Sequence, residues 1–66
     1  MAQSTEQEQQ RQTQQQINAI LAMARELRPY PYRGIHFDRF ARQLAALVSG
    51  PELDWARRRL ARALDV

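Results

Sequence analysis

The chain has 66 residues, no cysteine and a net charge of +3, and all ten of its basic residues are arginine. This length allows one domain, residues 1–66, and without cysteine neither a disulfide nor a thiolate metal site can stabilise it. No apolar run reaches the roughly 18 residues that span a bilayer, and the polar N-terminus does not resemble a signal peptide. We therefore expect a cytoplasmic all-α protein without membrane contact, and, because small cores are marginally stable, a helical homodimer.

Residues 1–16 form a polar segment with eight glutamines and no large apolar residue except Met1. Polar low-complexity segments are often disordered, whereas Gln, Glu and Arg favour helices, so this composition fits either a helix or partial disorder. Ser4 and Gln7 have the spacing of a capping box in which Ser4 is the N-cap. We favour a helix that begins near Thr5.

An amphipathic pattern starts at Ile17 and predicts a helix over residues 17–28. Its apolar side chains follow the i, i+3, i+4, i+7 spacing of a buried stripe. Pro29 disfavours the α conformation at the residue before it, so the helix should end at Arg28. A continuous helix from Thr5 to Arg28 would be long for so small a protein, and such helices usually pair with a second chain. The predicted core and dimer positions here are Ile17, Ile20, Leu21 and Leu27.

Residues 29–35 are predicted to form a linker, in which two prolines favour extended geometry. This linker carries Tyr30 and Tyr32. Two interpretations remain open for these side chains. Both tyrosines would pack over the core, or one of them would contribute to a partner surface, since tyrosine is common in interfaces.

The strongest amphipathic pattern predicts a second helix over residues 36–49, with its apolar side chains within roughly a 110° arc. Ile35 and Phe40 have the spacing of a hydrophobic staple if His36 is the N-cap. The predicted core positions in this helix are Phe37, Phe40, Leu44 and Leu47.

A very short connection separates this helix from a third one, predicted over residues 51–65. Gly50 can take the left-handed conformation that ends a helix, and Pro51 suits the first turn of the next helix. Ser49 and Glu52 also have capping-box spacing. The short connection predicts a helical hairpin in which the two apolar faces pack together. The predicted core positions in the third helix are Leu53, Leu60 and Leu64.

Trp55 is the sole tryptophan, and a helical wheel places it about 200° away from Leu53. It therefore shares a face with Arg58, Arg59 and Arg62. Three interpretations stay open. The ring would make a cation–π contact with Arg59, or fill space against the first helix or its copy in a dimer, or form a binding surface together with the arginines.

The sequence contains few residues that catalysis needs. His36 is the one histidine, and the two serines, at positions 4 and 49, are both predicted caps. Neither a nucleophile with its base nor paired acids in a cleft is indicated, and the two glycines are too isolated for a phosphate-binding loop. We expect no enzymatic activity, no catalytic residue, no cofactor and no metal site.

Two kinds of binding function remain. The short turn followed by an arginine-rich helix resembles a helix-turn-helix over about thirty residues, which implies nucleic-acid binding. The residues that carry this alternative are Arg57, Arg58, Arg59 and Arg62. However, acids occupy the start of the third helix, where a recognition helix meets bases, so the arginines are better placed for phosphates.

The favoured expectation is a module that binds a larger protein, as its regulator, inhibitor or adaptor. Tryptophan and arginine are the residues most enriched in interface hot spots. Small stand-alone proteins of phages and mobile elements often act in this way, which is an argument by analogy. The predicted partner-binding residues are Trp55, Arg58, Arg59, Arg62, Tyr30 and Tyr32.

Overall fold

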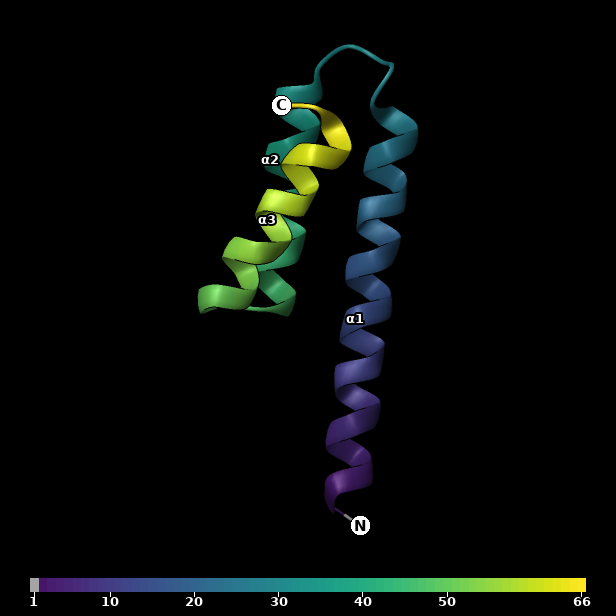
Figure 1. Cartoon of the computed structure of the whole chain (residues 1–66), viewed down its shortest axis with the longest axis vertical. Helices are drawn as coiled ribbons and strands as arrows, with labels where there is room; N and C mark the ends of the chain where they lie inside the picture. Colours follow the sequence, from purple (N-terminus) through teal and green to yellow (C-terminus); the bar gives the residue numbers. More distant parts are fainter. Residues whose placement is uncertain (1) are drawn as a thin grey trace.

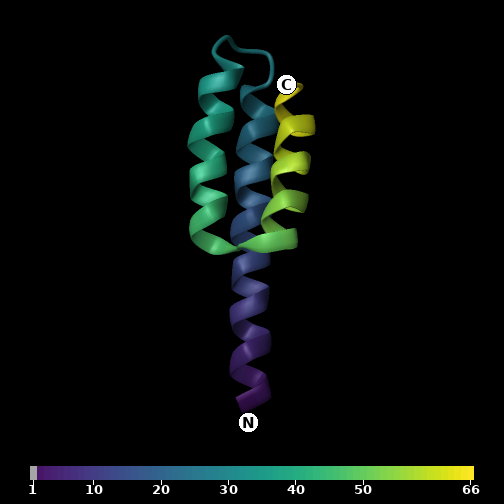
Figure 2. The same ribbon diagram turned by 90° about the vertical axis from the view of Figure 1, so that its left-hand side faces the viewer.

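The computed structural model describes the backbone of residues 2–66 and the side chains of residues 5–66. All regular structure in this part of the chain is helical, in three helices: α1 (Ala2–Leu27), α2 (Arg33–Leu47) and α3 (Gly50–Leu64). Figures 1 and 2 show α1 and α3 running in the same direction, with α2 running opposite to both. The all-α class predicted from the sequence is confirmed.

One apolar core lies between the three helices, each of which contacts the other two. Its largest fully buried side chains are Leu44, Leu60 and Leu64. The other buried residues are Ile17, Ile20, Leu21, Ala24, Phe40, Ala56 and Ala63, and Leu27, Phe37, Ala41, Leu47, Val48 and Leu53 pack against them. Each apolar stripe of the sequence therefore faces the same core.

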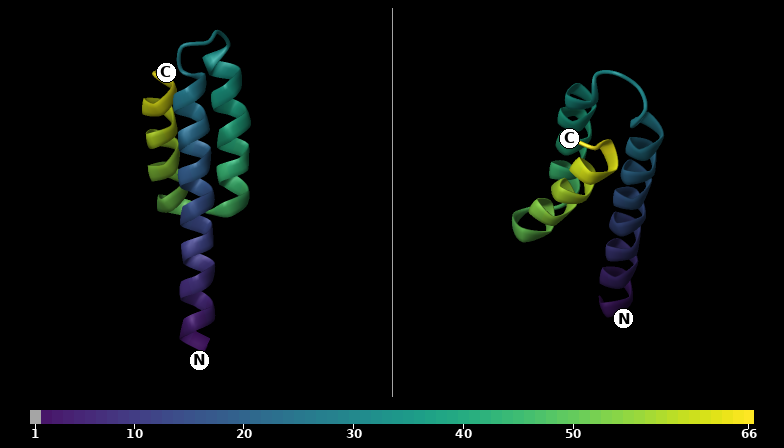
Figure 3. Two further views of the ribbon diagram at one scale, coloured as in Figure 1. Left: turned by 90° about the vertical axis from the view of Figure 1, so that its right-hand side faces the viewer. Right: turned by 45° about the horizontal axis from the view of Figure 1, so that its top comes forward.

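The N-terminal half of α1 extends beyond the other two helices, as Figures 2 and 3 show. A helix of 26 residues is about 39 Å long, whereas α2 and α3, with 15 residues each, are about 22 Å long. Side chains 5–12 are exposed, and from residue 5 onward the first buried residue is Ile17. The molecule is consequently elongated, with extents of 47 × 21 × 15 Å.

The start of α1 differs from the prediction. The helix begins at Ala2 instead of near Thr5, so Ser4 lies inside α1 and the predicted capping box with Gln7 is wrong. Alanine and glutamine before Ser4 favour the helix as well as the residues after it do, so nothing stops it there. Met1 lies outside the described residues.

The connection from α1 to α2 covers residues 28–32 and is shorter than the predicted linker. Tyr32 adopts the left-handed conformation, with φ 69°, and so reverses the direction of the chain. The helix then starts at once, because no residue after Pro31 restricts the backbone. Three residues that were assigned to the linker, 33–35, therefore belong to α2.

The early start of α2 overturns the predicted hydrophobic staple. His36 lies inside the helix, where its backbone N–H donates to the Tyr32 carbonyl oxygen at 3.0 Å, so His36 is not the N-cap. Ile35 is 66% exposed and does not cover Phe40 as a staple would.

The connection from α2 to α3 consists of Val48 and Ser49 in extended conformation. α2 therefore ends at Leu47, two residues before the predicted end. Gly50 has φ +63°, the left-handed value expected of it, but α2 has already ended at that point. Ser49 precedes α3 without a side-chain capping hydrogen bond, so the predicted capping box with Glu52 is wrong.

The C-terminus is held near the α1–α2 connection by exposed ion pairs. α3 ends at Leu64, and Asp65 takes a left-handed conformation with φ 60°. Arg33 Nη1 lies 3.4 Å from Asp65 Oδ2, and Arg28 Nη2 lies 3.9 Å from the same oxygen. Because all three side chains are largely solvated, each pair contributes at most about 1 kcal/mol to stability.

Candidate functional site

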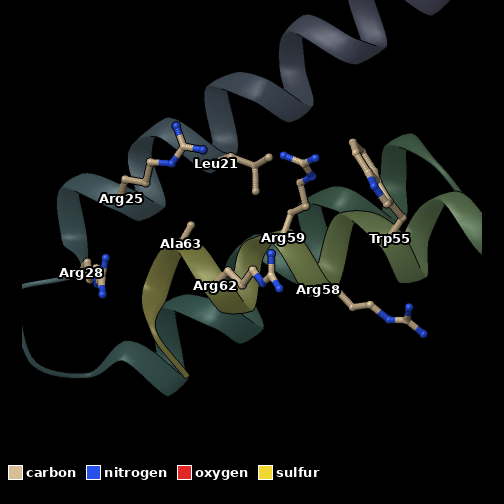
Figure 4. A pocket seen from close by; sticks show the side chains of 8 residues that line it. All are labelled: Leu21, Arg25, Arg28, Trp55, Arg58, Arg59, Arg62 and Ala63. Atoms are coloured by element: carbon tan, nitrogen blue, oxygen red, sulfur yellow. The ribbon is translucent and has the colours of Figure 1, made fainter.

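A groove of about 540 Å³ lies between α1 and α3 (Figure 4). Its floor is apolar and includes Leu21 and Ala63, which are almost fully buried. Its walls carry five arginines and the tryptophan. These are Arg25 in the last turn of α1, Arg28 directly after that helix, and Trp55, Arg58, Arg59 and Arg62 on α3.

Helical spacing explains how these side chains come to line one groove. On α1, Leu21 and Arg25 are spaced i, i+4 and lie on one face, and Arg28 follows in the turn directly after the helix. On α3, Trp55, Arg59 and Arg62 follow the i, i+4, i+7 pattern. Burial of the leucine face of α3 in the core turns this second face toward the groove. The two faces meet because α1 and α3 lie side by side in the same direction.

Trp55 makes the cation–π contact that the first interpretation predicts. The Arg59 guanidinium carbon lies 4.8 Å from the centroid of the Trp55 ring. Trp55 is 44% exposed, so it is not a core residue of the single chain. In Figure 4 the Arg59 guanidinium points into the groove near Leu21, whereas Arg58 points away from α1 at the outer edge. Much of the Trp55 ring therefore remains open to a ligand.

The groove is strongly basic. Of the five arginines that line the groove, Arg28 is paired with Asp65, and the other four form no ion pair with any described side chain. The described residues that line the groove include no carboxylate. Like charges on neighbouring turns repel one another, so an anion placed among them would relieve this repulsion.

A second hollow, of about 1200 Å³, adjoins the groove and shares Trp55 with it. It lies where the projecting half of α1 passes the connection between α2 and α3. Its lining includes Glu6 from α1 and Glu52 from the first turn of α3, together with Gln9, Gln10 and Gln14, and it includes no arginine. The charge of the lining thus changes sign on the two sides of Trp55.

The structure separates other predicted site residues from the groove. Arg57 lies over the Phe37 ring, 5.9 Å from its centroid, and does not line the groove. Tyr30 and Tyr32 are 60% and 70% exposed on the α1–α2 connection. The interpretation in which both tyrosines pack over the core is therefore wrong, and they do not join the Trp55 surface either.

Sequence reasoning missed Arg25 and Arg28 as members of the site. Their spacing from Leu21 was a usable signal, because it placed both arginines beside the buried stripe of α1. What the spacing could not supply was the neighbour of that face. Only the packing of α1 on α3 turns two separate arginine stripes into one groove.

The described residues carry little that indicates other chemistry. They contain no group of three His, Asp or Glu side chains arranged to hold a metal ion. None of the described helices combines the length and the apolar character that crossing a bilayer requires. No known protein family matches the chain, and neither a curated protein nor a solved structure is significantly similar to it.

Proposed function

We propose that this chain is a non-enzymatic binding module that holds an acidic segment of a larger protein in the groove between α1 and α3, and so regulates, inhibits or recruits that protein. The observation that carries the proposal is that five arginines and Trp55, from α1, the turn after it and α3, line one groove whose described lining includes no carboxylate. Tyr30 and Tyr32 are not needed for it.

The chemistry of the groove suits carboxylate side chains. Guanidinium groups bind carboxylates through paired, charge-assisted hydrogen bonds, and Arg25, Arg58 and Arg62 are free of internal partners in the described structure. The Trp55 ring and the apolar floor would cover the aliphatic parts of the bound segment. Half-exposed tryptophan beside arginine is also the composition of an interface hot spot.

The extent of the basic surface favours a peptide over a nucleic acid. From Trp55 to Arg62 the arginine-lined part of α3 covers about two turns, or about 10 Å. Beyond Trp55 the lining carries Glu6 and Glu52. A nucleic-acid strand repeats its negative charge about every 3.4 Å, so its continuation would meet these carboxylates. A short acidic segment meets no such repulsion.

Titration with a blocked peptide of four glutamates, which when extended is about as long as the arginine-lined part of the groove, tests this proposal, with the fluorescence of Trp55 as the signal. Because Trp55 is the sole tryptophan, its emission reports directly on the groove. We expect Arg62→Glu to weaken binding about tenfold or more, since it places a like charge against the ligand. Arg39→Glu is the matched control, because Arg39 lies on α2 beside another hollow and the net charge changes equally.

Equal effects of the two variants would show that binding follows net charge and does not use the groove. A labelled DNA duplex is titrated in parallel at about 50 and 200 mM salt. Four phosphate contacts give a log–log salt slope near −3.6, or roughly a hundredfold weakening over this range. Duplex binding with that slope, without peptide binding, would replace the proposal by the nucleic-acid alternative.

The proposal includes a homodimer. In a chain of 66 residues, a core that rests on a few large side chains favours association with a second copy. Sedimentation equilibrium is the direct test, with an expected mass of about twice the 7.7 kDa of the chain. A mass that stays at the single-chain value at high concentration would exclude the dimer.

A further inference from the structure

The reversal of charge at Trp55 has consequences for what the groove can bind. On one side of Trp55, toward the C-terminal ends of α1 and α3, arginines line the groove. On the other side of Trp55, glutamates line the adjoining hollow. Trp55 belongs to both linings. A ligand long enough to pass Trp55 therefore meets two surfaces of opposite sign.

The projecting half of α1 creates the acidic side. Because α1 continues well past the ends of α2 and α3 (Figure 1), its projecting half contributes Glu6 to the lining of this hollow. Glu52 reaches the same hollow from the first turn of α3. Neither glutamate forms an ion pair within the described part of the chain, so both are free to meet a ligand cation.

We propose that the segment bound by this surface is bipolar and binds in one direction. Its acidic end lies among Arg25, Arg59 and Arg62, and its basic end lies between Glu6 and Glu52. This inference rests on the proposed function, because it describes the partner of the same groove. It adds a second half to the site and a direction to the ligand.

Electrostatic complementarity of this kind fixes register and orientation more than raw affinity. A segment bound in reverse would place carboxylates against Glu6 and Glu52, and cations against the arginines. Gln9, Gln10 and Gln14 carry both donors and acceptors, so they tolerate either end and do not oppose the charged groups. The preference for one binding direction over the other therefore comes from the two charged ends of the surface.

The span of the surface sets the length of a suitable probe. Along α1, the distance from Glu6 to Arg28 is about 33 Å. An extended peptide of ten residues covers about the same length. Three blocked decapeptides are therefore compared by Trp55 fluorescence: EEEEGGKKKK, the isomeric EKEKGGKEKE, and EEEEGGQQQQ.

We expect the bipolar peptide to bind about fivefold or more tightly than EEEEGGQQQQ, since two further solvated ion pairs add at most about that factor each. EKEKGGKEKE should bind most weakly, although its composition equals that of the bipolar peptide. The double variant Glu6→Gln/Glu52→Gln should remove the advantage of the lysine end and leave the affinity for EEEEGGQQQQ nearly unchanged. Glu26→Gln/Asp38→Asn, which changes the net charge equally outside this surface, should preserve the advantage.

Two failures are distinguishable. If EEEEGGQQQQ and EEEEGGKKKK bind equally well, and the Glu6/Glu52 variant changes neither affinity, the bipolar inference is wrong while the acidic-segment function stands. If none of the three peptides binds, the proposed function itself fails. If EKEKGGKEKE binds as tightly as EEEEGGKKKK, the affinity depends on the composition of the peptide and not on the order of its charges, which also overturns the inference.

Discussion

Trp55 combines a structural contact with an open surface. Its ring receives the Arg59 guanidinium at 4.8 Å, and 44% of the residue stays exposed. A cation–π contact at such a solvated site contributes about 0.5–1 kcal/mol, which is too little to explain a tryptophan on stability grounds alone. The exposed part of Trp55 is the part that a bound segment would cover.

Substitution of the groove arginines separates these two roles. Arg59→Ala should lower the free energy of unfolding by about 0.5–1 kcal/mol and shift the emission of Trp55, because it removes the cation over the ring. Arg58→Ala is the control, since its guanidinium points away from α1 and no ring contact is found for it. Urea unfolding followed by circular dichroism measures the free energy of unfolding of both variants, and fluorescence measures the emission of Trp55. Equal losses in the two variants would mean that the ring contact has no energetic role.

The two glycines illustrate how much of each element local sequence determines. Gly50 has φ +63°, a value that costs other residues about 1–2 kcal/mol, and it starts α3 in the direction opposite to α2. Gly34 lies in the first turn of α2 with no atom within 4 Å of an added Cβ and no positive φ. Gly50 is needed for its left-handed backbone conformation, whereas Gly34 can be replaced by alanine.

Alanine at each glycine should therefore act in opposite directions. Gly50→Ala should destabilise the fold by about 1–2 kcal/mol. Gly34→Ala should stabilise it by about 0.4–1 kcal/mol, because alanine restricts the unfolded chain and fits the helix. Thermal unfolding of both variants provides the measurement, and a stabilised Gly50→Ala protein would contradict the left-handed turn.

Boundaries of the helices were less predictable than their existence. Periodicity is a local property, so the stripes that contain Ile17, Phe40 and Leu60 could be read from the sequence. The left-handed turn at Tyr32 could not be read from the sequence. A tyrosine rarely adopts this conformation, and does so here where α1 and α2 pack together and the chain reverses sharply between them. The linker was therefore predicted too long and the start of α2 too late.

At the scale of the whole molecule, α1 has two halves with different roles. Residues from Ile17 onward complete the core, whereas side chains 5–12 touch solvent. An isolated polar helix of this length is marginal in water, so the projecting half depends on the helix that the core nucleates. Its contribution lies in the surface that it carries beside the hairpin.

Deletion of residues 2–12 tests this division. The three-helix core should keep its melting temperature within about 5 °C, because the described side chains that are removed, 5–12, are all exposed. The preference for the bipolar peptide should disappear, since Glu6 is lost. A large fall in melting temperature, together with a fall in sedimentation mass, would instead place this half of α1 in a dimer interface.

The packing of whole helices also explains which part of the site could be predicted from the sequence. The α3 half, with Trp55, Arg59 and Arg62, follows from one helical wheel. The α1 half, with Arg25 and Arg28, depends on which helix lies beside which face, and the sequence leaves that choice open. A site shared by two helices is a property of their packing.

The most direct test of the central claim is an NMR measurement of the arginine Nε–Hε signals during titration with the four-glutamate peptide. The ten arginines provide both the test and the controls in one sample. We predict shifts at Arg25, Arg59 and Arg62 and little change at Arg39 and Arg42 on α2. Uniform small shifts across all ten arginines, or shifts confined to α2, would contradict a binding groove between α1 and α3.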